Sequence, residues 1–306
     1  MGGTETRPEM TYGFGGRYTK DFPSQVIIDL TEVCNLACIH CPHPAFKKSS
    51  HYGARFLDGV LNKKAVDEVK SHGSQYIRYT AEGEPLIHPE CHEYVQYAVE
   101  HSGTFVTLTT NGTLLNGRKM KRLLDSGLHM LDVSIDAATP ETYAKVRGGD
   151  YSKVLFHVKQ MAKMRGNCKL VVSFVEQPEN SHEAIAFHNL WKPLVDQVVI
   201  RRFHSAAGHL GSGVQLDRYP CIYPWERIVL TPGGYLSFCP QEWFGRAKMA
   251  DYRTTTIKEL WASPQYEALR IAHLTNQCFG VCEKCPDWKQ TRWHKESYAD
   301  LVESMK

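Results

Sequence analysis

Short runs of β-branched and other apolar residues alternate with longer amphipathic stretches between about residues 23 and 213. This alternation is typical of β–α units, whose strands pair into a parallel sheet. The stretches between the runs are long enough for right-handed helical crossovers. The pattern predicts an α/β protein with a partial (β/α)6 barrel of the TIM type. Its six expected strands are Val26–Leu30, Gln75–Thr80, Thr104–Thr109, Met130–Ile135, Lys169–Phe174 and Gln197–Ile200.

The alternation stops beyond about residue 215. There Arg227–Thr231 and Tyr235–Phe238 flank Pro232-Gly233-Gly234, which predicts a β-hairpin with a glycine turn. A stretch rich in Gly, Ser and Ala precedes this region and suggests a boundary. We therefore expect three parts: a polar leader over residues 1–22, the partial barrel over 23–213, and a small hairpin and helix module with a C-terminal tail over 214–306.

Composition and charge limit the size of the domains and the kinds of partner, but they do not indicate a function. The 306 residues suffice for one large barrel domain with a small appendage. The 36 Lys and Arg nearly balance the 33 Asp and Glu, so the net charge of +3 favours neither nucleic acid nor a membrane as a partner. No stretch approaches the ~18 apolar residues of a membrane span, and residues 1–6 lack the apolar centre of a signal peptide. We expect a soluble, cytoplasmic protein.

The ten cysteines carry the first chemical signal. In a long chain without a signal peptide, cysteines indicate metal ligands or catalytic thiols rather than a disulfide framework. Three of them follow the first expected strand with the spacing Cys34-x3-Cys38-x2-Cys41. A [4Fe–4S] cluster normally takes four thiolates, so three on one loop leave one iron open to another ligand. The loop alone leaves open a zinc site with a distant fourth ligand, or a Cys38-x2-Cys41 redox pair.

Polar motifs follow the next three expected strands. Glu82-Gly83-Glu84-Pro85 follows the second, where glycine permits close backbone approach and a carboxylate suits an ammonium group. Asn111 follows the third strand, and Ser134 and Asp136 lie at the end of the fourth. Because the carboxyl ends of parallel strands meet at one face of a barrel, these motifs should converge on the cysteine loop.

Each motif alone has a plain structural explanation. The acidic motif suits a helix-capping turn, and Asn-Gly is a favoured turn pair. Thr139 is placed to cap a helix that opens at Pro140, and Arg147 closes that helix, where a cation complements the helix dipole. The order of the motifs along successive strands, rather than any one of them, favours a shared site.

The cysteine spacing and the ordered motifs resemble the radical S-adenosylmethionine (SAM) superfamily, whose members bind SAM at the open iron of a [4Fe–4S] cluster. The resemblance implies that Cys34, Cys38 and Cys41 hold this cluster. It also implies SAM contacts for an aromatic position, for the acidic motif and for later polar residues: His40, Glu82, Gly83, Glu84, Pro85, Asn111, Ser134, Asp136 and Arg147. Two residues depart from the family pattern: the family has glycine where Glu82 stands, and often has glycine where Ala137 stands.

Five further cysteines lie in the C-terminal part, and Gly234 stands five positions before Cys239. This arrangement is similar to the SPASM and twitch modules of radical SAM enzymes. The resemblance implies a second, auxiliary [4Fe–4S] cluster on Cys221, Cys239, Cys282 and Cys285, in the shorter twitch form because no cysteine follows. An all-cysteine zinc site is the alternative.

Three cysteines remain outside these sets. Cys278 is a spare ligand, a buried small hydrophobe, or a thiol that donates a hydrogen atom to a substrate radical. Cys91 and Cys168 have no metal spacing and are expected to pack in the barrel.

The resemblance extends from about Gln25 to Trp288 and implies reductive cleavage of SAM to a 5′-deoxyadenosyl radical that abstracts a substrate hydrogen. Net oxidation through the auxiliary cluster, or epimerisation through a donor thiol, would follow. Expected partners are a one-electron donor such as flavodoxin or ferredoxin and a small polar substrate such as a sugar, aminocyclitol or sugar nucleotide. The alternatives are radical modification of a ribosomally made peptide and a non-enzymatic zinc or iron–sulfur protein.

Overall fold

The computed structural model describes residues 21–80, 82–211, 220–287 and 303. Most of the expected polar leader lies outside the described residues. The expected boundary at residues 213 and 214 and the tail from Trp288, except residue 303, also lie outside them.

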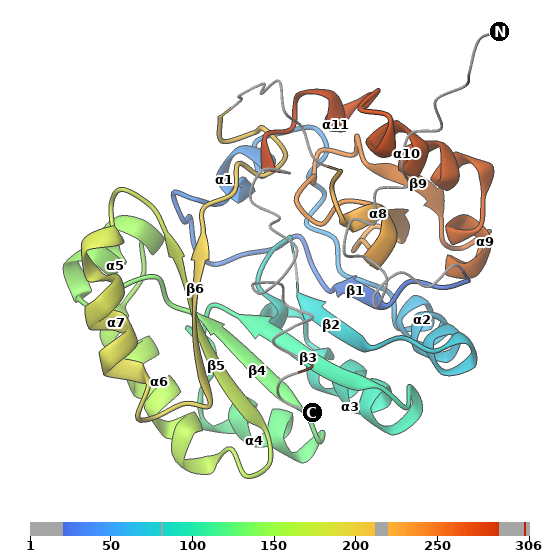
Figure 1. Cartoon of the computed structure of the whole chain (residues 1–306). Helices are drawn as coiled ribbons and strands as arrows, with labels where there is room; N and C mark the ends of the chain where they lie inside the picture. The colour runs from blue at the N-terminus through green and yellow to red at the C-terminus, as the bar shows by residue number, and fades with distance from the viewer. Residues whose placement is uncertain (1–20, 81, 212–219, 288–302, 304–306) are drawn as a thin grey trace, which may run out of the picture.

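Nine strands of the described chain form one sheet, in the order β6-β5-β4-β3-β2-β1-β7-β8-β9. The first six are parallel to one another and coincide with the six expected runs to within two residues at each end. The sheet is open, which confirms the partial barrel (Figure 1). The six strands are β1 (Gln25–Asp29), β2 (Tyr76–Thr80), β3 (Phe105–Thr110), β4 (Met130–Ser134), β5 (Lys169–Glu176) and β6 (Gln197–Arg202).

Helices between these strands cover one face of the sheet (Figure 1). Several of these helices are capped at their N-terminus by a side chain: Asp58, Asn116 and Thr139 each accept a hydrogen bond from a backbone amide of the first turn. None of the helices in the described part of the chain has the length and apolar character needed to cross a membrane. The helices are α1 (His43–Phe46), α2 (Gly59–His72), α3 (Cys91–His101), α4 (Gly117–Asp125), α5 (Pro140–Arg147), α6 (Tyr151–Met164) and α7 (Ala184–Trp191), with 3-10 turns at Pro85–Ile87 and Ser181–Glu183.

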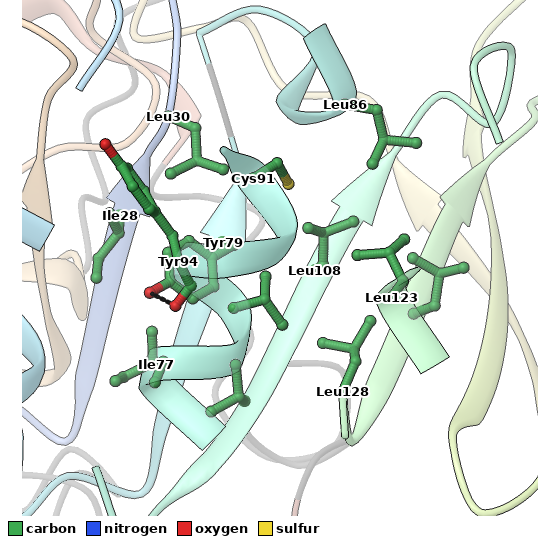
Figure 2. Packing of buried hydrophobic residues seen from close by; sticks show 14 of the residues in the cluster. Ile28, Leu30, Ile77, Tyr79, Leu86, Cys91, Tyr94, Leu108, Leu123 and Leu128 are labelled. Atoms are coloured by element: carbon green, nitrogen blue, oxygen red, sulfur yellow. Dashed lines mark hydrogen bonds between the residues drawn. The ribbon is translucent and has the colours of Figure 1, made fainter. Parts of the chain in front are cut away.

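Alternate residues of each strand pack against the helices. Figure 2 shows Ile28, Ile77 and Leu108 in this layer beside α3. The Tyr79 hydroxyl has two acceptors there, Asn62 Oδ1 at 2.7 Å and the Tyr94 carbonyl oxygen at 3.1 Å. Burial of each large side chain of this kind stabilises the fold by about 1.5–3 kcal/mol. Cys91 and Cys168 are buried in the same core, which confirms them as packing residues.

The C-terminal part extends the same sheet. The expected hairpin is present as β7 (Arg227–Leu230) and β8 (Tyr235–Ser237), and Gly234 has a positive φ of 80° in its turn. Its first strand pairs in parallel with β1, so the module is anchored beside the strand that leads into the cysteine loop. The remaining elements are β9 (Lys248–Asp251), α8 (Tyr223–Glu226), α9 (Ile257–Trp261), α10 (Pro264–Leu274) and α11 (Val281–Lys284).

Candidate iron–sulfur and SAM site

The turn after β2 holds the start of the cysteine loop. The Glu84 amide donates to the Val33 carbonyl at 2.8 Å. A Cβ atom on Gly83 would lie 2.1 Å from that same oxygen, far inside van der Waals contact, so only glycine fits. The buried Glu84 carboxylate caps the turn by accepting from the Leu86 amide at 3.1 Å. It also accepts from the Asn111 amide at 2.8 Å, which links the turns after β2 and β3.

The turn after β3 contacts the cysteine loop directly. The Asn111 side-chain amide donates to Asn35 Oδ1 at 3.0 Å, and Asn35 donates in turn to Thr113 Oγ1 at 2.8 Å. Asn35 is the neighbour of Cys34, so this exchange fixes the backbone at the first cysteine. Gly112 has a φ of 74°, which agrees with the expected Asn-Gly turn.

A buried ion pair between Asp136 and Arg147 lies beside the middle of the loop. Arg147 Nε donates to Asp136 Oδ2 at 2.7 Å, and the other carboxylate oxygen accepts from the Val175 amide at 2.6 Å. The two residues are 0% and 5% exposed. The Arg147 carbonyl lies 4.0 Å from Cys38 Sγ, and the Ile39 amide donates to the carbonyl before it at 3.0 Å. The end of α5 therefore packs against the loop.

His40 joins the same polar group. Its Nε2 lies 3.3 Å from Asp136 Oδ2, and its Nδ1 lies 3.2 Å from Gln177 Nε2. Burial lowers the pKa of His40 to about 4, although the Asp136 carboxylate acts in the opposite direction. The ring is therefore neutral at pH 7. Its contacts show that His40 links the cysteine loop to Asp136 and Gln177, which the spacing of the cysteines did not indicate.

The expected polar motifs after β2, β3 and β4 thus meet at the cysteine loop, as their order along the strands predicted. Ser134 lies slightly apart from them and contacts Ser173 at 3.4 Å. Glu84, Asp136 and Arg147 all have protein partners, and the Thr139 cap is present as expected. The contacts of these residues with SAM stay predictions.

The three loop cysteines fit an anionic cluster. Burial raises the pKa of Cys34 to about 11 and that of Cys41 to about 12, and the Arg147 guanidinium opposes the rise at all three thiols. A cluster requires thiolates, so its binding releases protons and gains from a nearby fixed cation. Arg147 supplies that cation, and its ion-pair partner Asp136 offsets part of the effect at Cys38.

The four cysteines expected to hold the auxiliary cluster line one cavity, together with apolar residues such as Phe238 and Val281. They come from the segment before α8, the end of β8, and α11 with its exit: Cys221, Cys239, Cys282 and Cys285. Within the described residues, no three His, Cys, Asp or Glu side chains are placed to hold a single metal ion. The feature that fits a cluster of several irons is the cavity that the four cysteines share. Cys278 does not line this cavity, and its Sγ lies 3.6 Å from the Ala272 carbonyl oxygen.

Polar side chains on the inner face of the sheet, opposite the helices, form a second group that the motifs did not indicate. Asp132 of β4 accepts from Arg201 of β6 at 2.8 Å and from the Ser173 hydroxyl of β5 at 2.9 Å. Arg78 of β2 donates to Thr109 of β3 at 3.3 Å. The available signal was a charged residue at alternate positions of otherwise apolar strands. We call this group the lumen residues.

Two buried carboxylates, Asp29 and Glu82, lie at the end of β1 and shortly after the end of β2. Burial raises the pKa of Asp29 to about 7, and the positive charge of Arg78 limits the rise. Burial and the charge of Asp29 also raise the pKa of Glu82. These carboxyl groups therefore retain protons nearer neutrality than ordinary ones.

Replacing Asp29 with asparagine should change how stability depends on pH. In the folded protein the pKa of this carboxyl lies above its ordinary 3.8. The protonated carboxyl therefore contributes folding stability that is fully present below about pH 4 and is lost as the pH rises through about 7. Relative to the parent, Asp29→Asn should therefore gain stability as pH rises from 5 to 8, by about 2–3 kcal/mol, because at pH 5 the parent has already lost part of the roughly 4 kcal/mol that separates a pKa of about 7 from 3.8. Denaturant unfolding at both pH values measures this difference.

The matched control is Asp125→Asn, at an exposed carboxylate of α4 that pairs with Lys121. Its stability difference from the parent should stay within about 0.5 kcal/mol at both pH values. An Asp29→Asn difference that is equal at pH 5 and pH 8 would contradict the assigned pKa.

Three cysteines on the loop after β1, and four around a cavity of the module that pairs with β1, are donor sets of the kind that iron–sulfur clusters take. The chain belongs to the radical SAM superfamily, whose family model matches residues 28–186. A second family model, for an iron–sulfur cluster-binding domain named SPASM, matches residues 221–286. These domains imply SAM and [4Fe–4S] clusters as cofactors, and membership of this family supports an enzyme over a non-enzymatic scaffold.

Curated relatives share part of the chain. An AdoMet-dependent heme synthase of Methanosarcina barkeri is 36% identical over 143 residues, which are 46% of this chain and 40% of the relative. A GTP 3′,8-cyclase of Alkaliphilus oremlandii is 33% identical over 143 residues, 45% of this chain and 42% of the relative. The chain thus spans about two fifths of the length of these two relatives.

Solved structures share the whole fold. BtrN in complex with AdoMet and 2-DOIA has a TM-score of 0.64 at 17% identity and covers 90% of this chain and 97% of that one. SuiB of Streptococcus suis bound to the precursor peptide SuiA has a TM-score of 0.66 at 14% identity and covers 92% of this chain and 73% of that one. At these identities the likeness confirms the fold, a partial barrel with a C-terminal auxiliary module.

Proposed function

We propose that the protein cleaves SAM to a 5′-deoxyadenosyl radical and uses it to take a hydrogen atom from a small polar substrate. The observation that carries this proposal is the convergence of the turns after β2, β3 and β4 on the three-cysteine loop. When bound, the loop cluster supplies the electron that cleaves SAM. The protein's own task is to hold the loop, orient SAM and keep water from the radical.

The chain divides these tasks among its residues. Gly83 and Asn111 fix the loop backbone, and Arg147 offsets the negative charge of the cluster. We retain the expected SAM contacts as part of the proposal: His40, Glu82, Gly83, Glu84, Pro85, Asn111, Ser134, Asp136 and Arg147. Their support is that Glu84, Asn111, Asp136 and Arg147 each contact residues of the cysteine loop.

The lumen residues support a substrate rich in hydroxyl groups. Arg201 and Arg78 present charged donors from two strands, and the buried Asp132 orients Arg201; sugars, aminocyclitols and sugar nucleotides offer acceptors for such donors. The overlap with 97% of BtrN, whose solved complex contains AdoMet and 2-DOIA, agrees with a small substrate. A ribosomally made peptide is the second candidate, supported by the likeness to SuiB in its complex with SuiA.

Net oxidation is the outcome we favour, with epimerisation as the alternative. Oxidation needs an electron acceptor, which the four-cysteine cavity would provide when its cluster is bound. Epimerisation needs a hydrogen donor, and Cys278 is the spare thiol. Its Sγ contacts Ala272 and His273 within the C-terminal module, which favours packing. A donor of flavodoxin or ferredoxin type would supply electrons in the cytoplasm.

The test incubates reconstituted enzyme with SAM and dithionite in D2O, together with a panel of sugars, aminocyclitols, sugar nucleotides and short peptides. We expect one polar small molecule to raise 5′-deoxyadenosine formation and to yield a product that has lost the elements of H2. A product that instead gains one solvent deuterium identifies an epimerase. In that case Cys278→Ser should stop turnover but not SAM cleavage, whereas in an oxidase it should leave turnover unchanged. Absence of 5′-deoxyadenosine with every compound would contradict the proposal.

A further inference from the structure

One carboxylate joins the loop after β6 to the cysteine pair of the C-terminal module. Asp287 Oδ1 accepts from the Ser205 amide at 2.5 Å, and its Oδ2 accepts from the Ala207 amide at 2.8 Å. The same Oδ2 lies 3.9 Å from Cys285 Sγ, and the side chain lines the four-cysteine cavity. Asp287 therefore contacts both the β6 loop and the cavity.

The backbone that Asp287 holds is in an unfavourable conformation. Ala206 and Ala207 have φ values of 51° and 55°, in the left-handed region where a Cβ atom is disfavoured. Both are buried, at 0% and 5% exposure. A carboxylate that accepts from two amides compensates for such a bend through charge-assisted hydrogen bonds. The bend thus depends on an acceptor that lies beyond it in the C-terminal module.

The bend connects the lumen residues to the cavity. Arg201, which pairs with Asp132 in the lumen, lies four residues before Ser205, whose amide donates to Asp287. Ala207, at the far end of the bend, is itself a wall of the cavity. Any shift of the β6 loop would therefore change the distance between the lumen and the auxiliary site.

We infer that Asp287 is a positioning residue of the auxiliary centre, which fixes the β6 loop against the cysteine pair and places a negative charge inside the cavity. The inference rests on the proposed function, in which the four cysteines hold a [4Fe–4S] cluster. A fixed carboxylate near the sulfurs disfavours the more negative, reduced form of a cluster, so it lowers the reduction potential. The fixed loop keeps the substrate space at one distance from that cluster.

The test uses the full chain with both clusters reconstituted and compares the parent with Asp287→Asn and Asp287→Glu. A redox titration followed by electron paramagnetic resonance reports the auxiliary cluster, whose signal is the one that SAM leaves unchanged. Hydrogen exchange reports the amides of Ser205 and Ala207. Asp125→Asn on the surface of α4 is the control for loss of one carboxylate.

Asp287→Asn should raise the auxiliary potential and speed exchange at the two amides by about tenfold, because asparagine has one acceptor oxygen and no charge. Asp287→Glu should speed exchange but keep a potential near that of the parent, since only the geometry changes. Parent-like potential and exchange in Asp287→Asn would overturn the inference. If Asp287→Asn loses the cluster, parent-like exchange in Asp287→Glu would overturn it. Absence of auxiliary iron in the parent would overturn the two-cluster proposal instead. The exchange rates would still test whether Asp287 holds the amides of Ser205 and Ala207.

Discussion

Replacing any one of Cys34, Cys38 or Cys41 with alanine is expected to abolish 5′-deoxyadenosine formation while the barrel remains folded. Three thiolates are the minimum that holds a [4Fe–4S] cluster with one open iron, so two cannot keep the SAM-binding iron in place. The fold should persist because the loop cysteines lie outside the main core of the barrel. Chromatography of the reaction products measures 5′-deoxyadenosine, and far-ultraviolet circular dichroism checks the fold.

The control for these variants is Cys168→Ala, which removes a core thiol as buried as that of Cys38, at 5% against 8% exposure. It should cost about 1 kcal/mol of stability and leave 5′-deoxyadenosine formation near that of the parent. Parent-like formation of 5′-deoxyadenosine by any of the three loop variants would refute the assignment of the loop cluster.

Gly83→Ala is expected to reduce 5′-deoxyadenosine formation by at least about a hundredfold, the effect of misplacing a reacting group by about 1 Å. The new Cβ would lie 2.1 Å from the Val33 carbonyl oxygen, and the obstacle is backbone that cannot rotate away. The loop must move, which also costs roughly 1–3 kcal/mol of folding stability. Measurements are the rate of 5′-deoxyadenosine formation and the midpoint of thermal unfolding.

Gly117→Ala is the matched control because a Cβ there meets nothing within 4 Å at the start of α4. Alanine should be neutral or slightly stabilising at that helical position. If Gly83→Ala behaved like Gly117→Ala in rate and in stability, the close contact between the β2 turn and the cysteine loop would be wrong.

The barrel could be predicted because its strands are apolar and evenly separated by helical stretches. The pairing of β7 with β1 could not, since the pattern of Arg227–Leu230 identifies a strand and carries no information about its partner. The predicted hairpin was present, yet only the fold shows that it continues the barrel sheet beside the cysteine loop.

For the site, spacing identified the cysteines and the order of the motifs predicted their convergence. Contacts between distant residues had no local signal in the sequence. The ion pair of Asp136 and Arg147 and the position of His40 beside it depend on tertiary structure. The hydrogen bonds from the β6 loop to Asp287 do so as well. The lumen residues had a weak signal, a charged residue such as Asp132 within an apolar strand.

The central claim, two [4Fe–4S] clusters on two cysteine sets, is tested most directly by measuring iron, acid-labile sulfide and zinc in anaerobically reconstituted protein. The comparison is a variant with Cys34, Cys38 and Cys41 all replaced by alanine. We expect about eight irons per chain in the parent and about four in the variant. About four irons with about one zinc in the parent would contradict the auxiliary cluster, and zinc alone would contradict radical SAM chemistry in this protein.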